Sequence, residues 1–278
     1  MPQSVAVAIV HGIGRQTEDF AAGMIRRLRK RVARRLGPDP PGAPRLFFAP
    51  VHWAKVLQDK EDELSIRLSH GGKLGWNRLR TFMVDFAADA IAYQPIPRGR
   101  DAYDDVHALF AGRLRELAEQ AGPHAPLCVI SHSLGTVIAS NFFYDLQAHS
   151  RQKPLIAQKV LERMSPAPLA CGETLALWSM RFAEFGTPLR VPSPKLPEHY
   201  PNLAGEWVNF YDRADVIGYP LKGLNEEYRA AVSADRAVRV GSWLRFWNPL
   251  SHMEYFEDGN VLEPIADGLA RVWSAVNP

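Results

Sequence analysis

Short apolar runs alternate with longer amphipathic segments along most of the chain. Runs of strand length, rich in Val, Ile, Leu and Phe, cover residues 4–10, 45–51, 127–130 and 207–211, with weaker candidates at 160–164 and 237–241. Helical spacing of apolar residues marks residues 17–36, 101–120, 134–146 and 264–276. Apolar strands separated by helices are typical of a parallel sheet that is buried on both faces. The pattern therefore predicts an α/β fold with a mostly parallel central sheet and helices on both faces.

The helix expected at residues 17–36 has an apolar stripe at a spacing of four, running from Phe20 to Leu36. Its outer face carries seven basic residues between Arg26 and Arg35. They form either a solvated helix face or a surface for an anionic partner. The intact apolar stripe, without interleaved aromatic residues on the basic face, favours the solvated face.

Residues 54–99 form a segment that is long for a connection between two strands. We expect a charged helix at 54–68 and an apolar helix at 76–93, separated by a glycine break. The apolar helix either packs against the sheet or forms a lid over an apolar pocket, since insertions between sheet elements commonly shape substrate access. We therefore treat residues 1–278 as a single domain that carries a helical insertion, or cap, at 54–99.

Composition excludes several classes of protein. The chain has 278 residues, of which 46% are hydrophobic and 23% are charged, as in an ordinary globular protein. The net charge of +3 gives no reason to expect a nucleic-acid partner, and two cysteines are too few for a disulfide framework. No apolar run approaches 18 residues, so we expect no transmembrane segment. The first residues lead directly into a strand without a basic leader, from which we expect a cytoplasmic protein.

The segment with the most specific pattern is residues 126–139. The apolar strand Leu127–Ile130 is separated from the helix beginning at Leu134 by Ser131-His132-Ser133 alone. Such an abrupt strand-to-helix turn needs small residues on either side, and Ser131 and Gly135 fill those places. This is the nucleophile-elbow pattern G-x-S-x-G with Ser in place of the first Gly, and it lifts the hydroxyl of Ser133 above the strand end.

The first strand ends in His11-Gly12-Ile13-Gly14, for which three interpretations are open. A dinucleotide site would need a third glycine and a carboxylate about 20 residues further on, and both are missing. A plain tight turn is the second interpretation. We prefer the third, an oxyanion loop, because glycines let backbone N–H groups approach a substrate oxygen. The expected donors are the N–H of Leu134 and that of Gly12 or Ile13.

Polar residues also follow two later strands. Asp212 and Asp215 come after the strand at 207–211, and His252 follows the strand at 237–241. In a parallel sheet these carboxyl ends lie at one edge, so the side chains can meet Ser133 there. We predict a catalytic triad of Ser133, Asp215 and His252, with Asp212 as the rival for the acidic position.

The order Ser, Asp, His and the elbow resemble those of α/β-hydrolases of the lipase/esterase type. The segments Asp215–Pro220 and His252–Tyr255 are similar to those in which several lipases carry their acid and their histidine. The resemblance covers most of the chain outside residues 54–99 and 153–201. It implies the α/β-hydrolase fold and serine chemistry without a cofactor. We also expect substrate contacts from Trp53, His132 and Met253, although Trp53 and His132 could equally be packing residues.

We therefore predict a serine hydrolase that cleaves a small-molecule carboxylic ester through an acyl-enzyme. Cleavage of a thioester or an amide, or acyl transfer with the same triad, stays open, because a triad does not select the leaving group. A non-catalytic scaffold that binds a protein partner or an anionic membrane surface is the alternative from another class. Peripheral contact with a membrane is compatible with both the hydrolase and the scaffold. The spacing of Cys, His and Asp predicts no metal site, and the oligomeric state is left open.

Overall fold

A six-stranded parallel sheet forms the centre of the fold, in the order β2-β1-β3-β4-β5-β6. The computed structural model describes residues 2–13, 16–58, 63, 91–94, 102–148, 166–171, 175–180, 182–241 and 249–278. The strands are β1 (Val5–Val10), β2 (Leu46–Val51), β3 (Leu127–His132), β4 (Pro166–Cys171), β5 (Val208–Asp212) and β6 (Ala234–Val238). The predicted α/β fold with a parallel sheet is thus confirmed.

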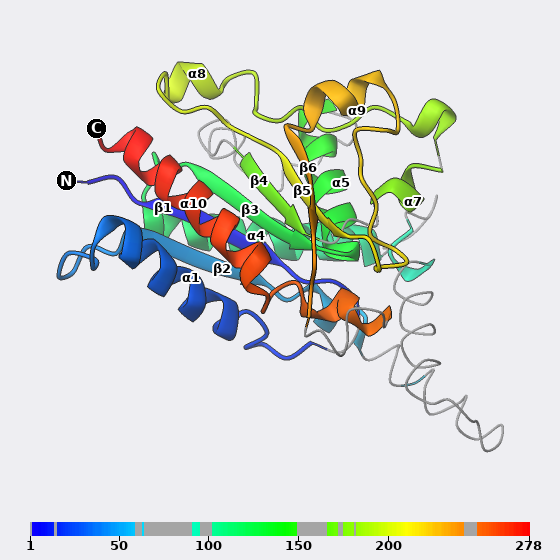
Figure 1. Cartoon of the computed structure of the whole chain (residues 1–278), viewed down its shortest axis with the longest axis horizontal. Coiled ribbons are helices and arrows are strands. Elements are labelled where there is room, and N and C mark those ends of the chain that lie inside the picture. The colour runs from blue at the N-terminus through cyan, green and yellow to red at the C-terminus, as the bar shows by residue number, and fades with distance from the viewer. Residues whose placement is uncertain are drawn as a thin grey trace.

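Helices cover both faces of the sheet (Figure 1). Side chains of a strand alternate between its two faces, and in β1 both sets are buried. Val5, Val7 and Ile9 pack in the core beneath α1 (Ala22–Leu36) and α10 (Gly259–Val276). The alternate residues of β1 pack in the core beneath α4 (Ala102–Ala121) and α5 (Leu134–Ala148). Burial on both faces explains why this strand is apolar without interruption.

The remaining helical segments are short. They are η1 (Trp53–Val56), α7 (Leu175–Ser179), η2 (Ala183–Phe185), α8 (Leu196–His199), α9 (Glu226–Ala231) and η3 (Pro249–Glu254). By sequence, residues 176–185 fit either a helix or a strand. In the structure this segment includes most of α7 and all of η2. The two termini lie side by side at one end of the sheet, where the Asn277 side chain exchanges hydrogen bonds with the backbone of Gln3 (Figure 1).

Two helix starts and one strand differ from the sequence prediction. Helix α1 begins at Ala22 rather than Thr17, because Thr17 and Asp19 bond to each other in a turn that precedes it. Helix α10 begins at Gly259 rather than Pro264, because the Asp258 side chain caps its first turn. Strand β6 lies three residues earlier than predicted, at Ala234–Val238.

Strand β4 was not predicted, since Pro166 and Pro168 break the pattern expected of a central strand. A proline cannot donate a hydrogen bond to a neighbouring strand. The structure accommodates both, because β4 pairs with β5 only from Leu169 onward and pairs with β3 alone before that. The weaker strand candidate at 160–164 lies outside the described residues.

Most of the predicted insertion at 54–99 also lies outside the described residues, which include only 54–58, 63 and 91–94 of it. The two expected helices and their possible use as a lid therefore stay predictions. At the end of this segment Tyr93 is buried, and its hydroxyl hydrogen-bonds to His107 of α4 at 2.9 Å. The end of the segment is thus attached to the helical layer over β1.

The side of the sheet on which successive strands are added changes at β1. The chain passes from β1 to β2 on one side and then returns to place β3 on the other side. In parallel α/β sheets, such a reversal opens a crevice at the carboxyl ends of the two strands, where ligands bind. Here those two ends carry His11-Gly12-Ile13 and Ser133.

Candidate active site

Ser133 occupies a sharp turn between β3 and α5, as the elbow pattern predicts. Its φ angle is 54°, a left-handed conformation that a residue with a side chain rarely adopts. The turn is closed by a hydrogen bond of 2.9 Å from Thr136 N to Ser133 O. Helix α5 starts at the next residue, so the N–H of Leu134 is in the first helical turn and has no partner within the helix.

Gly135 lets α5 begin directly against β1. A Cβ atom at this position would lie 2.2 Å from the carbonyl oxygen of His11 and 2.8 Å from that of Val10. Gly12 makes a similar approach from the other side, where a Cβ would lie 2.7 Å from Cβ of Ser133. Two glycines thus bring the loop after β1 and the elbow into contact.

His252 and Asp215 form a buried pair. Nδ1 of His252 lies 2.7 Å from Oδ2 of Asp215, and both side chains are almost fully buried. A carboxylate in this place holds the imidazole in one tautomer, with its proton on Nδ1 and its lone pair on Nε2. Burial raises the pKa of Asp215. The hydrogen bond and charge of His252 lower this pKa, as do the hydrogen bonds from Ile217 N and the Tyr255 hydroxyl, and together they outweigh the effect of burial. The net pKa of Asp215 lies below its usual value, so the carboxylate is charged at neutral pH.

Asp212, the other candidate for the acid of the triad, binds backbone amides instead of His252. Its Oδ2 accepts a hydrogen bond from Val240 N at 2.6 Å, and its Oδ1 accepts one from Ala214 N at 2.8 Å. These bonds connect the loop after β5 to the residues just after β6. Of the two aspartates, Asp215 is the one that the structure places on His252.

His132 connects the elbow to the histidine segment. Its Nε2–H donates to the backbone carbonyl of His252 at 2.7 Å, and the two rings lie 4.7 Å apart. Burial, together with the nearby His252, lowers the pKa of His132 to about 3, so the ring is neutral. Because His132 is the neighbour of Ser133, this bond ties His252 to the elbow.

The two reactive atoms expected of the triad are buried and unpaired. Neither Ser133 Oγ nor His252 Nε2 has a hydrogen-bond partner in the part of the chain that the structure describes. Such bonds are often long before substrate binds. The link between the serine and the Asp215–His252 pair is thus the bond from His132 to His252 O, and no direct bond joins Oγ and Nε2.

The loop after β1 is held by a network around His11. Nδ1–H of His11 donates to Gly12 O at 2.6 Å, and His11 O accepts from Trp53 Nε1 at 2.8 Å. The Trp53 ring also stacks on the His11 ring, with centroids 4.9 Å apart. Burial lowers the pKa of His11 to about 3, so this ring is neutral as well.

This network sets the direction of two peptide groups. The His11 carbonyl points to Trp53 Nε1, so the N–H of Gly12 points the opposite way. The Gly12 carbonyl points to His11, and in a planar trans peptide the N–H of Ile13 points the opposite way. The N–H of Ile13 is therefore turned away from the His11 ring. The network thus fixes the orientation of both donors that the sequence left open in this loop, Gly12 and Ile13, and Gly14 lies outside the described residues.

The three predicted substrate contacts fall into two groups. Trp53 and His132 are buried and support the loop after β1 and the histidine segment. Met253, next to His252, has 41% of its surface exposed. Met253 is thus the one of the three with its side chain open to solvent.

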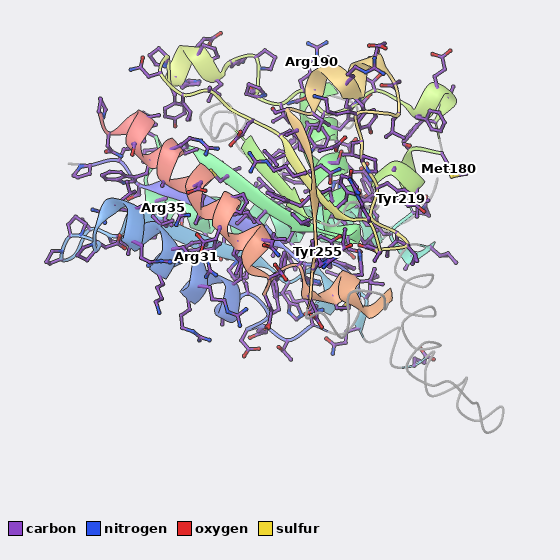
Figure 2. The ribbon with its side chains drawn as sticks, in the orientation of Figure 1. Arg31, Arg35, Met180, Arg190, Tyr219 and Tyr255 are labelled. Atoms are coloured by element: carbon purple, nitrogen blue, oxygen red, sulfur yellow. The ribbon has the colours of Figure 1, made fainter. Side chains whose placement is uncertain are left out.

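Tyr255 is a site residue for which sequence reasoning assigned no role. Its hydroxyl accepts from Asp212 N at 2.7 Å and donates to Asp215 Oδ2 at 3.1 Å. The ring is fully buried near the lower end of α10 (Figure 2). The feature of the sequence that could have identified Tyr255 is its position three residues after His252, because this spacing brings two side chains to the same side of a helical turn.

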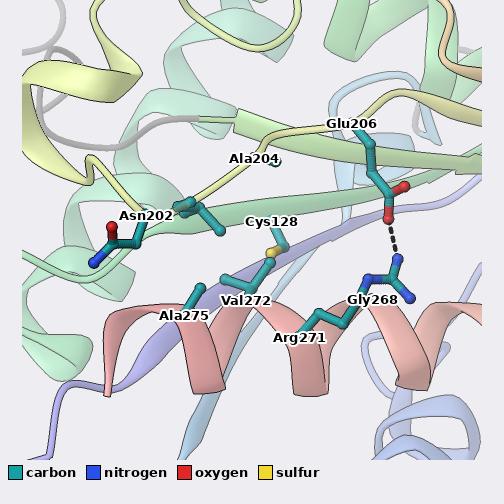
Figure 3. A pocket seen from close by; sticks show the side chains of 9 residues that line it. Cys128, Asn202, Ala204, Glu206, Gly268, Arg271, Val272 and Ala275 are labelled. Atoms are coloured by element: carbon teal, nitrogen blue, oxygen red, sulfur yellow. Dashed lines mark hydrogen bonds and ion pairs between the residues drawn. The ribbon is translucent and has the colours of Figure 1, made fainter. Parts of the chain in front are cut away.

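A separate cavity of about 240 Å³ lies between α10 and the segment that precedes β5. Cys128 and Val272 line it, and the ion pair between Glu206 and Arg271 is at its side (Figure 3). Cys128 is five residues before Ser133, or about 16 Å along an extended strand, so this cavity is at the opposite edge of the sheet. Burial raises the pKa of the Cys128 thiol to about 12, which leaves it an unreactive packing residue.

The basic face of α1 contacts α10. Glu263 accepts hydrogen bonds from Arg31, Arg34 and Arg35 at 2.7–3.0 Å. Arg35 also bonds Asp267 at 2.5 Å, and Figure 2 shows Arg31 and Arg35 between the two helices. Much of the predicted basic surface is therefore engaged within the molecule.

Comparison with known proteins gave no relative. No family model, no curated protein and no solved structure matches the chain. Among the described residues, no helix is long and apolar enough to cross a membrane. Within the same residues, no cluster of three or more His, Cys, Asp or Glu side chains could hold a metal ion.

Proposed function

We propose that the chain is a serine hydrolase of the α/β-hydrolase type that cleaves carboxylic esters. The observation that carries the proposal is the buried pair of His252 and Asp215, which the bond from His132 ties to the elbow of Ser133. A left-handed serine between a parallel strand and a helix, next to such a pair, is the arrangement that nucleophilic acyl transfer needs.

In the first half-reaction, Ser133 Oγ attacks the acyl carbonyl while its proton passes to Nε2 of His252. Asp215 stabilises the imidazolium that forms. The tetrahedral intermediate then expels the alcohol, which takes the proton from Nε2, and an acyl-enzyme remains. In the second half-reaction, a water molecule gives its proton to Nε2 and attacks the acyl carbon, and Ser133 leaves with the proton returned.

The negative oxygen of each tetrahedral intermediate needs two donors. The N–H of Leu134 at the start of α5 is one, and it carries the partial positive charge of a helix terminus. The N–H of Gly12 or that of Ile13 is the second, since the bonds at His11 O and Gly12 O fix the orientation of both. One such donor contributes about 2.7–4 kcal/mol to transition-state stabilisation.

Labelling with a fluorophosphonate tests the proposal, because this reagent reacts with activated serines. Wild type, Ser133→Ala and His252→Gln are treated side by side, and the adduct is located by mass spectrometry. We expect modification of Ser133 in wild type, no modification in Ser133→Ala, and labelling at least about 10³-fold slower in His252→Gln. Folded wild-type protein that is not labelled, with or without detergent, would contradict the proposal.

The two aspartates provide a matched pair of variants. Asp215→Asn leaves His252 with the wrong tautomer, so hydrolysis of a short acyl ester should fall by about 10⁴-fold. Asp212→Asn removes a carboxylate that binds backbone amides only and should retain most of the activity. The reverse result would assign the acidic position to Asp212. Parallel assays with a thioester and with an alcohol acceptor decide between ester hydrolysis, thioester hydrolysis and acyl transfer.

A further inference from the structure

Tyr255 bridges the end of β5 and the carboxylate that faces His252. Its hydroxyl oxygen accepts a hydrogen bond from Asp212 N at 2.7 Å, so its own hydrogen is left to donate to Asp215 Oδ2 at 3.1 Å. The same oxygen of Asp215 accepts from His252 Nδ1 at 2.7 Å. One carboxylate oxygen therefore receives two hydrogen bonds, while Oδ1 accepts from Ile217 N at 3.1 Å.

The hydroxyl has little freedom to make another bond. The Tyr255 ring is fully buried and lies 5.5 Å from the ring of His132 and 6.0 Å from that of His252, measured between centroids. Gly218 closes the other side, since a Cβ there would lie 2.7 Å from Asp215 Oδ2 and 3.3 Å from the Tyr255 hydroxyl. The donor is thus held on the carboxylate by the backbone of β5 and by close packing.

We propose that Tyr255 is a positioning residue for Asp215: its hydroxyl fixes the carboxylate against His252 and keeps that carboxylate charged. This inference rests on the proposed function. A hydrogen bond to a charged carboxylate stabilises the charged form. Burial and the neighbouring Asp215 raise the pKa of Tyr255 above its usual value, so the phenol remains a donor at all working pH values.

The other titratable groups around the pair have settled roles. Asp212 is fastened by Val240 N and Ala214 N. His132, on the elbow side, is buried and neutral. Among the described residues, the side chains that hydrogen-bond Asp215 are thus those of His252 and Tyr255.

The test uses Tyr255→Phe, which keeps the buried ring and removes only the hydroxyl. The control is Tyr200→Phe, since Tyr200 is also buried and donates at 2.5 Å to His124 O, a backbone oxygen outside the site. Ester hydrolysis is measured as a function of pH for wild type and both variants. We expect kcat of Tyr255→Phe to fall about 10- to 100-fold with little change in KM, as for loss of a hydrogen bond to a charged group.

The pH profile separates positioning from general damage. Without the hydroxyl, the Asp215–His252 pair binds its proton more tightly, so the acidic limb of kcat/KM should move up by about one pH unit. Tyr200→Phe should retain the wild-type limb. A Tyr255→Phe profile that coincides with wild type, in a variant of unchanged melting temperature, would overturn the inference.

A second measurement does not depend on activity. The proton on His252 Nδ1 gives a downfield NMR resonance when it is bonded to a carboxylate, and loss of the Tyr255 hydroxyl should shift this resonance. If fluorophosphonate fails to label Ser133 but the resonance shifts in Tyr255→Phe, the proposed function is wrong and the positioning role stands. An unmoved resonance in Tyr255→Phe refutes the positioning role even when wild type is labelled.

Discussion

At the scale of single residues, the elbow depends on close backbone contacts. Ser133 has a φ angle of 54°, and a side-chain-bearing residue in that conformation costs on the order of 1–3 kcal/mol. The surrounding structure must hold it there. Gly135 contributes by letting the first turn of α5 contact the carbonyl of His11.

Gly135→Ala is predicted to displace the elbow. Its Cβ would lie 2.2 Å from a backbone oxygen, a contact that only a backbone shift can relieve. We expect a loss of at least about 2 kcal/mol in the free energy of unfolding, together with loss of Ser133 labelling. Denaturant titration and fluorophosphonate labelling measure the two effects.

Gly23→Ala in α1 is the matched control. It is also a helical glycine, but a Cβ there meets nothing within 4 Å. Removing backbone freedom from the unfolded chain should raise stability by about 0.5–1 kcal/mol and leave labelling unchanged. If both alanine variants behaved alike, the close approach at Gly135 would not be a constraint on the elbow.

At the scale of elements, helices α1 and α10 contact each other through both apolar and charged side chains. The buried stripe of α1 consists of Met24, Leu28 and Val32. Glu263 of α10 forms ion pairs with three arginines of α1. The side chain of Glu263 is 42% exposed, so solvent weakens these ion pairs.

We predict that the apolar stripe stabilises this helix pair far more than the ion pairs do. Leu28→Ala should lower the free energy of unfolding by about 2–5 kcal/mol, because Leu28 is fully buried. Glu263→Gln should cost less than about 1 kcal/mol. Urea titrations in low and high salt measure both. A larger loss for Glu263→Gln than for Leu28→Ala would show that the charges, rather than the stripe, hold α1 on α10.

At the scale of the whole molecule, two buried neutral histidines make stability depend on pH. His11 and His132 have an ordinary pKa of 6.5 when unfolded and a pKa of about 3 in the fold, chiefly because of burial. Between pH 6.5 and pH 3 the unfolded chain therefore binds more protons than the folded one. Their contribution is complete above pH 6.5 and is lost as the pH falls toward 3.

We expect the free energy of unfolding to fall by about 1.4 kcal/mol per pH unit for each of these histidines below pH 6. Urea titrations at pH 7, 6, 5 and 4 measure this slope. His132→Gln should have a shallower slope, and His124→Gln, at an exposed position, should retain the wild-type slope. An equal slope in all three proteins would contradict the assignment to buried histidines.

Much of the arrangement follows from sequence because it is local. Apolar runs give the strands β1, β2, β3 and β5, since residues buried on both faces need no polar alternation. The spacing of small residues around Ser133 gives the elbow, and the apolar runs before Ser133 and Asp215 place both residues just after a strand. These features depend on neighbours within one or two helical turns.

Tertiary structure alone decided which partners meet. Asp212 and Asp215 are only three residues apart in the sequence. Only the fold shows that Asp212 accepts a hydrogen bond from Val240 N, whereas Asp215 pairs with His252. The role of Tyr255 depends in the same way on a contact 40 residues away. Strand β4 contains prolines that local rules exclude, but its one-sided pairing before Leu169 permits them. Local patterns specify turns and periodicity, whereas contacts between distant segments are set by the register and packing of the whole sheet.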